Sequence, residues 1–247
     1  MTPVQHAWES LSNTMRVYVE TRLGFERLRR IDQEEAINNV DRALEAKLEK
    51  FHALYDVTKN LSGFDYFAHG DTSLVVALRN AIHHRDHDLF ISWNALLGLN
   101  DGMTRLAGAA FLLGSTTPES DALTTRFYFR LQDFYDRLSM PKAQTKIQNP
   151  AKLKSMWDAE LMFADIHAKG KAERYPVKQV YVDVMPAFMT AVSRVSKWLA
   201  ATDFRPTGYD GKTYFEHFRA LELAKELDFK ELRVPAWSAL PKETPAA

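Results

Sequence analysis

The chain has 247 residues, 46% of them hydrophobic and 26% charged, so it can bury a large core. Lysine plus arginine and aspartate plus glutamate each number 32, which excludes a global basic field for tight nucleic-acid binding. The absence of cysteine excludes disulfides, thiolate zinc sites and a cysteine nucleophile, and it fits a cytoplasmic location. We expect no signal peptide and no membrane span, because no apolar stretch approaches about 18 residues.

The N-terminal part of the chain predicts two long amphipathic helices. Apolar residues recur every three or four positions over 8–23 and again over 37–55. Asp32 directly precedes the second helix and Glu35 follows three positions later, which is the spacing of a helix N-cap and capping box. We interpret both apolar stripes as ordinary core.

A third helix is predicted to begin at Asp71 or Thr72 and to end in an unusual cluster of side chains. Residues 78–88 contain two arginines, three histidines and two aspartates around one asparagine. Imidazoles titrate near physiological pH whereas guanidinium stays charged, so this mixture suits proton transfer beside a phosphate group. No other segment of the chain concentrates chemistry in this way.

Three further helices are predicted before Pro141. The stretches 89–99 and 103–113 are apolar enough to form buried helices, and an Asn-Asp-Gly breaker at 100–102 separates them. Apolar residues at helical spacing predict another helix that ends near residue 139 and begins near Pro118. Pro141 marks the predicted domain boundary.

The C-terminal segment is also predicted to be helical. Helices are expected over about 149–168, 188–200 and 214–229. The valines of 177–184 alternate as they would in a strand, but the surrounding helices favour a helix that is broken or kinked at Pro186.

These elements predict an all-α fold. We expect a helical bundle over residues 1–140 and a C-terminal helical extension over 141–247, with a mobile proline-containing tail from about 234.

One pattern within the histidine-rich cluster carries a more specific hypothesis. Arg79 is followed by Asn80 and, after three further residues, by His84. This pattern resembles the RNA-cleaving motif of the HEPN superfamily, in which an arginine and an adjacent polar residue precede a histidine by a few positions. The match follows two long amphipathic helices, as in that family, and the resemblance covers at most residues 1 to about 140.

The resemblance implies an HEPN-like helical bundle that acts as a metal-independent endoribonuclease, a defence effector or toxin. RNA carries its own nucleophile, the 2′-hydroxyl group, so a histidine of near-neutral pKa can promote cleavage without a metal. By the resemblance His84 is the catalytic base or acid, Arg79 stabilises charge on the phosphate, and Asn80 orients the histidine or the phosphate. Unpaired or loop regions of RNA are the expected substrate.

The resemblance also implies a homodimer with a composite active site and permits an antitoxin or another defence-system partner. No cofactor and no metal are expected. On an unbroken helix Arg79 and His83 share a face, whereas Arg79 and His84 diverge by about 140°. His83 is therefore the substitute for His84 in the catalytic role.

Two other functions stay open at this stage. The chain is interpreted alternatively as a non-catalytic HEPN-like interaction or scaffold module whose histidines are incidental. A lesser alternative is a metal-dependent phosphohydrolase that uses the histidine cluster. Four lysines after the domain boundary are positioned for contact with a phosphate backbone, but a solvated face is the favoured interpretation; they are Lys142, Lys146, Lys152 and Lys154.

Overall fold

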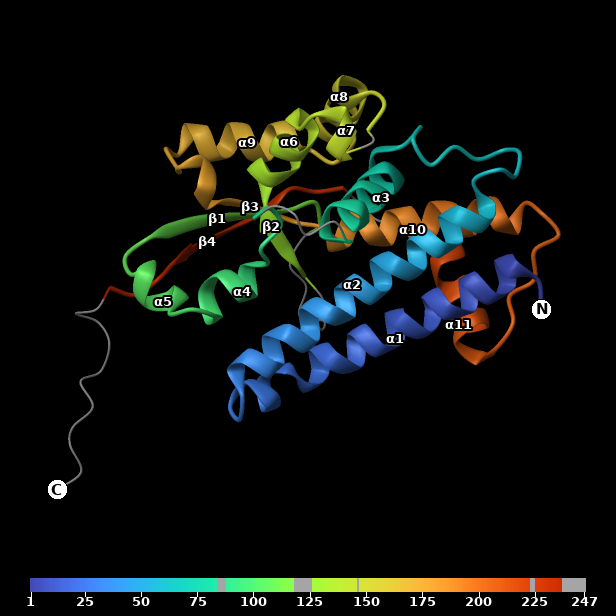
Figure 1. The fold of residues 1–247 in the computed structure, drawn as a ribbon, viewed down its shortest axis with the longest axis horizontal. Helices are drawn as coiled ribbons and strands as arrows, with labels where there is room; N and C mark the ends of the chain where they lie inside the picture. The colour runs from blue at the N-terminus through green and yellow to red at the C-terminus, as the bar shows by residue number, and fades with distance from the viewer. Residues whose placement is uncertain (84–87, 118–125, 146, 223–224, 237–247) are drawn as a thin grey trace.

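The computed structural model describes residues 1–83, 88–117, 126–145, 147–222 and 225–236. Long helices pack beside a four-stranded sheet, so the fold is mixed α/β (Figure 1). The predicted all-α fold class is therefore wrong.

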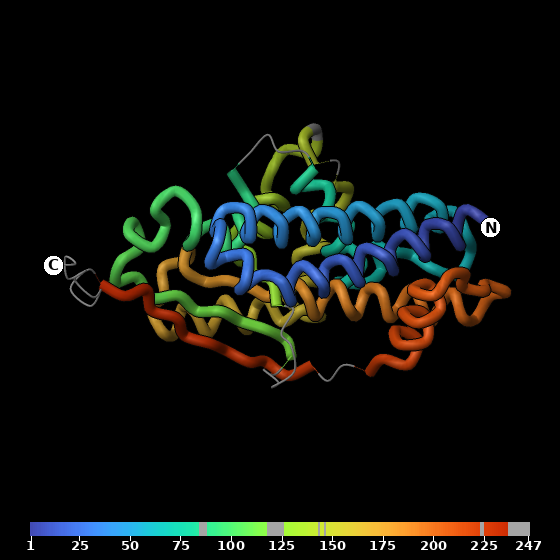
Figure 2. The backbone as a smooth tube through the Cα atoms, turned by 90° about the horizontal axis from the view of Figure 1, so that it is seen from below, coloured from blue at the N-terminus to red at the C-terminus, as the bar shows by residue number. Residues whose placement is uncertain are grey.

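The two predicted N-terminal helices are confirmed. Helix α1 (Pro3–Arg29) and helix α2 (Gln33–Thr58) form a hairpin and lie side by side along most of their length (Figures 1 and 2). Their apolar stripes are buried, as predicted, and Trp8 and Phe51 are fully inaccessible. The Asp32 side chain caps α2 by accepting a hydrogen bond from the backbone N–H of Glu35.

Helix α3 (Gly70–His83) packs between α2 and helix α10 (Met185–Ala200). It begins at Gly70, earlier than predicted, because Glu160 accepts the Gly70 N–H at 2.8 Å in place of a local cap. Asp71, one of the two predicted caps, instead accepts three hydrogen bonds of 3.1 Å from Arg194 on α10. This paired contact fixes α3 against α10.

The sheet has the strand order β2-β3-β1-β4. Strand β1 (Ala110–Ser115) lies at its centre, parallel to β3 (Val180–Asp183) and antiparallel to β4 (Asp228–Arg233). Strand β2 (Tyr128–Arg130) pairs antiparallel with the other edge of β3.

Strands β2 and β3 lie in stretches that the sequence predicted to be helical, and β1 and β4 overlap the ends of the helices predicted over 103–113 and 214–229. Strand β1 is the clearest case, because it reads Ala-Phe-Leu-Leu-Gly-Ser and all but its first residue are buried. A strand buried on both faces shows no polar–apolar alternation, and a short apolar run does not distinguish it from a buried helix. The strands that pair with β1 lie far away along the chain, so the local sequence does not predict the pairing.

Helices cover both faces of the sheet. On one face, Phe111, Leu113 and Tyr181 pack against Trp93 of the short helix α4 (Trp93–Gly98). The alternate residues of the same strands join the main core on the opposite face, where α6 and α9 lie (Figure 1). The remaining helices are α5 (Gly102–Arg105), α6 (Leu131–Ser139), α7 (Lys142–Thr145), α8 (Pro150–Glu160), α9 (Phe163–Ala172), the 3₁₀ helix η1 (Val177–Gln179) and α11 (Tyr209–Ala220).

The helix predicted over 149–168 is two helices. Met162 adopts a left-handed conformation with φ of 56°, which ends α8 and allows α9 to start in a new direction. The predicted domain boundary at residue 140 does not coincide with a gap in the core, because residues from both sides form one hydrophobic cluster. Val234, at the start of the predicted mobile tail, is buried and donates its N–H to the Ala109 carbonyl.

Lys47 on α2 is buried in the core, which is a rare location for a lysine. Its Nζ lies 3.9 Å from the ring centre of Tyr18 and 4.2 Å from that of Phe188, and the residue is 3% exposed. The aromatic faces attract a cation. Burial nevertheless lowers the pKa of Lys47 from 10.5 to about 7, with an opposing effect from Asp183.

Lys47 should make the free energy of unfolding rise with pH. Between about pH 7, the folded pKa, and 10.5, the ordinary value, the unfolded chain binds a proton that the folded chain has lost. We expect urea unfolding to show increasing stability over this window. The Lys47→Met variant should lose the slope and gain about 1–4 kcal/mol at pH 7. Lys50→Met, an exposed change on the same helix, is the control. Equal slopes in wild type and Lys47→Met would contradict this account.

Candidate functional site

The predicted catalytic residues lie at the C-terminal end of α3. Arg79, Asn80 and His83 belong to its last turns. His84, the histidine of the motif, follows directly and lies outside the described residues. The structure therefore gives the positions of Arg79, Asn80 and the substitute histidine, His83.

Arg79 and His83 share a face of α3, as the helical spacing predicted, and both contact Glu49 on α2. The Arg79 Nη2 atom lies 2.8 Å from Glu49 Oε2, and the His83 Nδ1 atom lies 3.1 Å from Glu49 Oε1. Partial burial raises the pKa of Glu49, but the hydrogen bond and charge of Arg79 and the contact with His83 outweigh it, so the pKa is lowered. Glu49 is thus a carboxylate at neutral pH.

The guanidinium group of Arg79 also orients the neighbouring asparagine. Its Nη1 donates a 3.2 Å hydrogen bond to Asn80 Oδ1, while its Nε is buried with no hydrogen-bond partner among the described residues. The Arg79 side chain is 17% exposed, so part of it is accessible from the surface. A cavity of about 280 Å³ lies at this contact and is lined by Arg42, Glu45, Ala46, Leu48, Glu49, Arg79, Ile82 and His83.

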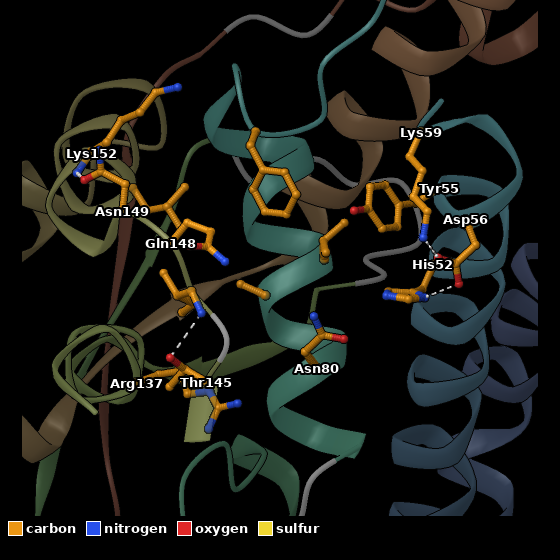
Figure 3. Close-up of a pocket in the computed structure, with 15 residues that line it drawn as sticks. His52, Tyr55, Asp56, Lys59, Asn80, Arg137, Thr145, Gln148, Asn149 and Lys152 are labelled. Carbon is orange, nitrogen blue, oxygen red and sulfur yellow. Dashed lines mark hydrogen bonds and ion pairs between the residues drawn. The ribbon is translucent and has the colours of Figure 1, made fainter. Parts of the chain in front are cut away.

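A larger cavity of about 810 Å³ lies on the other side of Asn80. We call it the α2–α3–α8 pocket. Figure 3 shows α2 on one side, the chain before and in α8 on the opposite side, and α3 with Asn80 between them. Trp157 of α8 donates a 3.1 Å hydrogen bond to Ser73 Oγ of α3, which fixes the distance between the two helices. The pocket is lined by His52, Tyr55, Asp56, Lys59, Phe67, Val76, Ala77, Asn80, Arg137, Thr145, Ile147, Gln148, Asn149, Lys152 and Leu153.

The α2 wall of this pocket carries a linked set of three polar side chains. Asp56 Oδ2 lies 3.1 Å from His52 Nδ1, and Asp56 Oδ1 accepts a 2.8 Å hydrogen bond from Lys59. Burial lowers the pKa of His52, and the charge of Arg79 lowers it further, whereas Asp56 and Glu49 act in the opposite direction. His52 is therefore neutral at pH 7, with its Nδ1–H directed to Asp56 and its Nε2 available as an acceptor.

The opposite wall is rich in cations and amides. Arg137, Gln148, Asn149 and Lys152 line the pocket from this side, and Figure 3 shows the Gln148 side chain directed toward α3. Of the four lysines that the sequence singled out, Lys152 lines the pocket, whereas Lys154 forms a 2.5 Å ion pair with Asp158 within α8.

Glu49 and His52 are functional-site candidates that the sequence interpretation did not select. Both lie in the C-terminal half of α2, within the last three turns of the helix. A glutamate or histidine on an amphipathic helix is ordinarily solvated, and only the packing of α3 against α2 brings these two beside Arg79.

Within the part of the chain that the structure describes, no three histidine, aspartate or glutamate side chains are grouped so that they could hold a metal ion. That set excludes His84 and His87. Within the same residues, no helix has both the length and the apolar composition to cross a membrane.

Comparisons with protein-family models, with curated proteins and with solved structures give no match.

The titration of His52 tests the geometry of the α2 wall. We expect a pKa below the ordinary 6.5 in NMR spectra of the histidine rings. Asp56→Asn should lower it further, because a carboxylate that favours the imidazolium form is removed. Arg79→Gln should raise it, because a repelling charge is lost, whereas Arg79→Lys keeps the charge and is the matched control. An unchanged titration in both Asp56→Asn and Arg79→Gln would show that these groups do not surround His52 in solution.

Proposed function

We propose that the protein is a metal-independent endoribonuclease, and that the C-terminal end of α3 is its active site. One observation carries the proposal most. Arg79 is partly exposed, lines the smaller cavity, is oriented by Glu49, and is hydrogen-bonded to Asn80, which lines the larger cavity. A positioned guanidinium beside histidines is suited to a phosphodiester that cleaves through its own 2′-hydroxyl.

In this proposal a histidine removes the proton of the 2′-hydroxyl as its oxygen attacks the adjacent phosphorus. The bond from phosphorus to the 5′-oxygen breaks, and this oxygen takes up a proton as it leaves. The products are a 2′,3′-cyclic phosphate and a 5′-hydroxyl. We assign the histidine role to His84, with His83 as its substitute, and the stabilisation of phosphate charge to Arg79.

A base and an acid are both needed, and two copies of the motif across a twofold axis would supply them. We therefore propose a homodimer with a composite active site. The resemblance to the HEPN motif supports a role as a defence effector or toxin that acts on unpaired RNA in the cytoplasm, with an antitoxin or another defence protein as its partner. This proposal rests on the motif and not on the fold, which is not an all-α bundle.

One observation favours a second candidate, a non-catalytic interaction module. The ion pair of Arg79 with Glu49 also braces α2 against α3, which is a structural role that needs no substrate. The two candidates differ in what the motif substitutions do to RNA.

The test compares the cleavage of a labelled single-stranded RNA in EDTA by wild type and by four variants, which are Arg79→Ala, His84→Ala, His83→Ala and His6→Ala. Arg79→Ala and His84→Ala should each reduce the rate by at least about a hundredfold, because each removes a group that stabilises the transition state or moves a proton. His6→Ala changes an exposed histidine of α1 and should leave the rate unchanged. Thermal unfolding of each variant checks that it is folded.

Equal cleavage by wild type and His84→Ala, with the loss appearing only in His83→Ala, would transfer the histidine role to His83. Equal cleavage by all variants, or no cleavage by folded wild type on any RNA offered, would reject the endoribonuclease and leave the interaction module.

A further inference from the structure

The α2–α3–α8 pocket has the size and the lining of a small-molecule site. Its volume of about 810 Å³ falls within the range of about 300–1,000 Å³ that is usual for bound ligands. The pocket begins at Asn80 and extends away from the Arg79–Glu49 pair. It is not needed for the proposed phosphate chemistry, so its shape and charge require a separate explanation.

The charge of the lining favours an anion. Among the described lining residues, Lys59, Arg137 and Lys152 are cations and Asp56 is the single carboxylate. Asp56 is already engaged by Lys59 and His52. Lys152 is exposed and forms no ion pair with another described residue, so its ammonium group is available to a phosphate.

The apolar part of the lining favours a flat aromatic group. Phe67 is 38% exposed although it is a large apolar side chain, and it lies in edge contact with Tyr55 at a ring separation of 6.1 Å. An exposed ring in a cation-lined cavity is the arrangement on which nucleic-acid bases stack.

The polar groups of the α2 wall are suited to the hydroxyl groups of a ribose. Neutral His52 donates through Nδ1 to Asp56, so its other ring nitrogen can accept a hydrogen bond from a hydroxyl group. Figure 3 shows the His52 ring between Asp56 and Asn80, with its far edge toward Asn80. A 2′-hydroxyl group is a donor that DNA lacks.

We propose that the α2–α3–α8 pocket binds one ribonucleotide unit of the RNA substrate, with its phosphate at Lys152 and its 2′-hydroxyl at His52. The proposal rests on the proposed function in naming RNA as the source of the nucleotide. Binding of a free nucleotide does not require cleavage, so the two can fail separately.

Isothermal titration calorimetry with adenosine 5′-monophosphate, whose phosphate and 2′-hydroxyl lie on opposite sides of the ribose, tests the pocket directly on the full chain. We expect millimolar or tighter binding that weakens about tenfold in Lys152→Gln, because a charge-assisted hydrogen bond is lost. Lys154→Gln is the matched control, since Lys154 is an exposed lysine two positions away that pairs with Asp158 outside the pocket lining, and it should bind as wild type does. The 2′-deoxy nucleotide should bind more weakly than the ribonucleotide, and His52→Phe should remove that difference.

The pocket proposal would be overturned by no binding at millimolar nucleotide, by equal binding of adenosine without phosphate, or by equal binding of inorganic phosphate alone. Equal losses in Lys152→Gln and Lys154→Gln would also overturn it, because they would indicate attraction by general surface charge.

Kinetics with RNA separate this proposal from the endoribonuclease. Lys152→Gln should raise KM with little change in kcat, because Lys152 binds the substrate away from the bond that breaks. Lysine-dependent nucleotide binding by a protein that cleaves no RNA would support the pocket and reject the proposed function. RNA cleavage with an unchanged KM in Lys152→Gln and no nucleotide binding would reject the pocket and leave the function.

Discussion

Asp183 is the buried carboxylate on which the joining of sheet and helices depends. Its Oδ1 accepts the backbone N–H groups of Phe127 and Met185 at 3.0 Å, and its Oδ2 accepts the Ser115 hydroxyl at 3.1 Å. These three donors come from the approach to β2, the start of α10 and the end of β1. A buried donor left without its acceptor costs about 1–3 kcal/mol, so this one side chain joins the start of α10 to the end of β1 and the approach to β2, both more than fifty residues earlier in the chain.

The same contact positions the candidate site. Because Asp183 fixes where α10 begins, it also fixes the place of Arg194, which binds Asp71 at the start of α3. Helix α3 then presents Arg79 to Glu49 on α2. Burial raises the pKa of Asp183 and lowers that of the nearby Lys47. Both groups therefore lie where the protein interior makes their ionised forms costly. We infer that these buried polar groups specify one arrangement of α10 against α2 and α3.

The sequence predicted the parts of this arrangement that depend on local periodicity. The long apolar stripes of α1 and α2 and the cap at Asp32 are present, and Arg79 and His83 share the face that 3.6 residues per turn requires. The sheet was missed because β1 is an unbroken apolar run whose partner, β3, lies more than sixty residues away. Glu49, His52 and the α8 wall of the pocket were missed for a related reason. Each becomes a candidate site residue only because another helix packs against it. No local residue pattern predicts such a contact.

The candidate site joins two kinds of chemistry at the end of one helix. Arg79, with Glu49 and His83, offers a charged group and an imidazole at the surface, and Asn80 connects them to the α2–α3–α8 pocket, for which we propose a nucleotide ligand. The central claim is that RNA is cut by its own 2′-hydroxyl group with protein side chains alone. The end groups of the products test it most directly, by mass spectrometry of an oligoribonucleotide cut in EDTA. The account predicts a 2′,3′-cyclic phosphate and a 5′-hydroxyl, whereas a 3′-hydroxyl and a 5′-phosphate would contradict it.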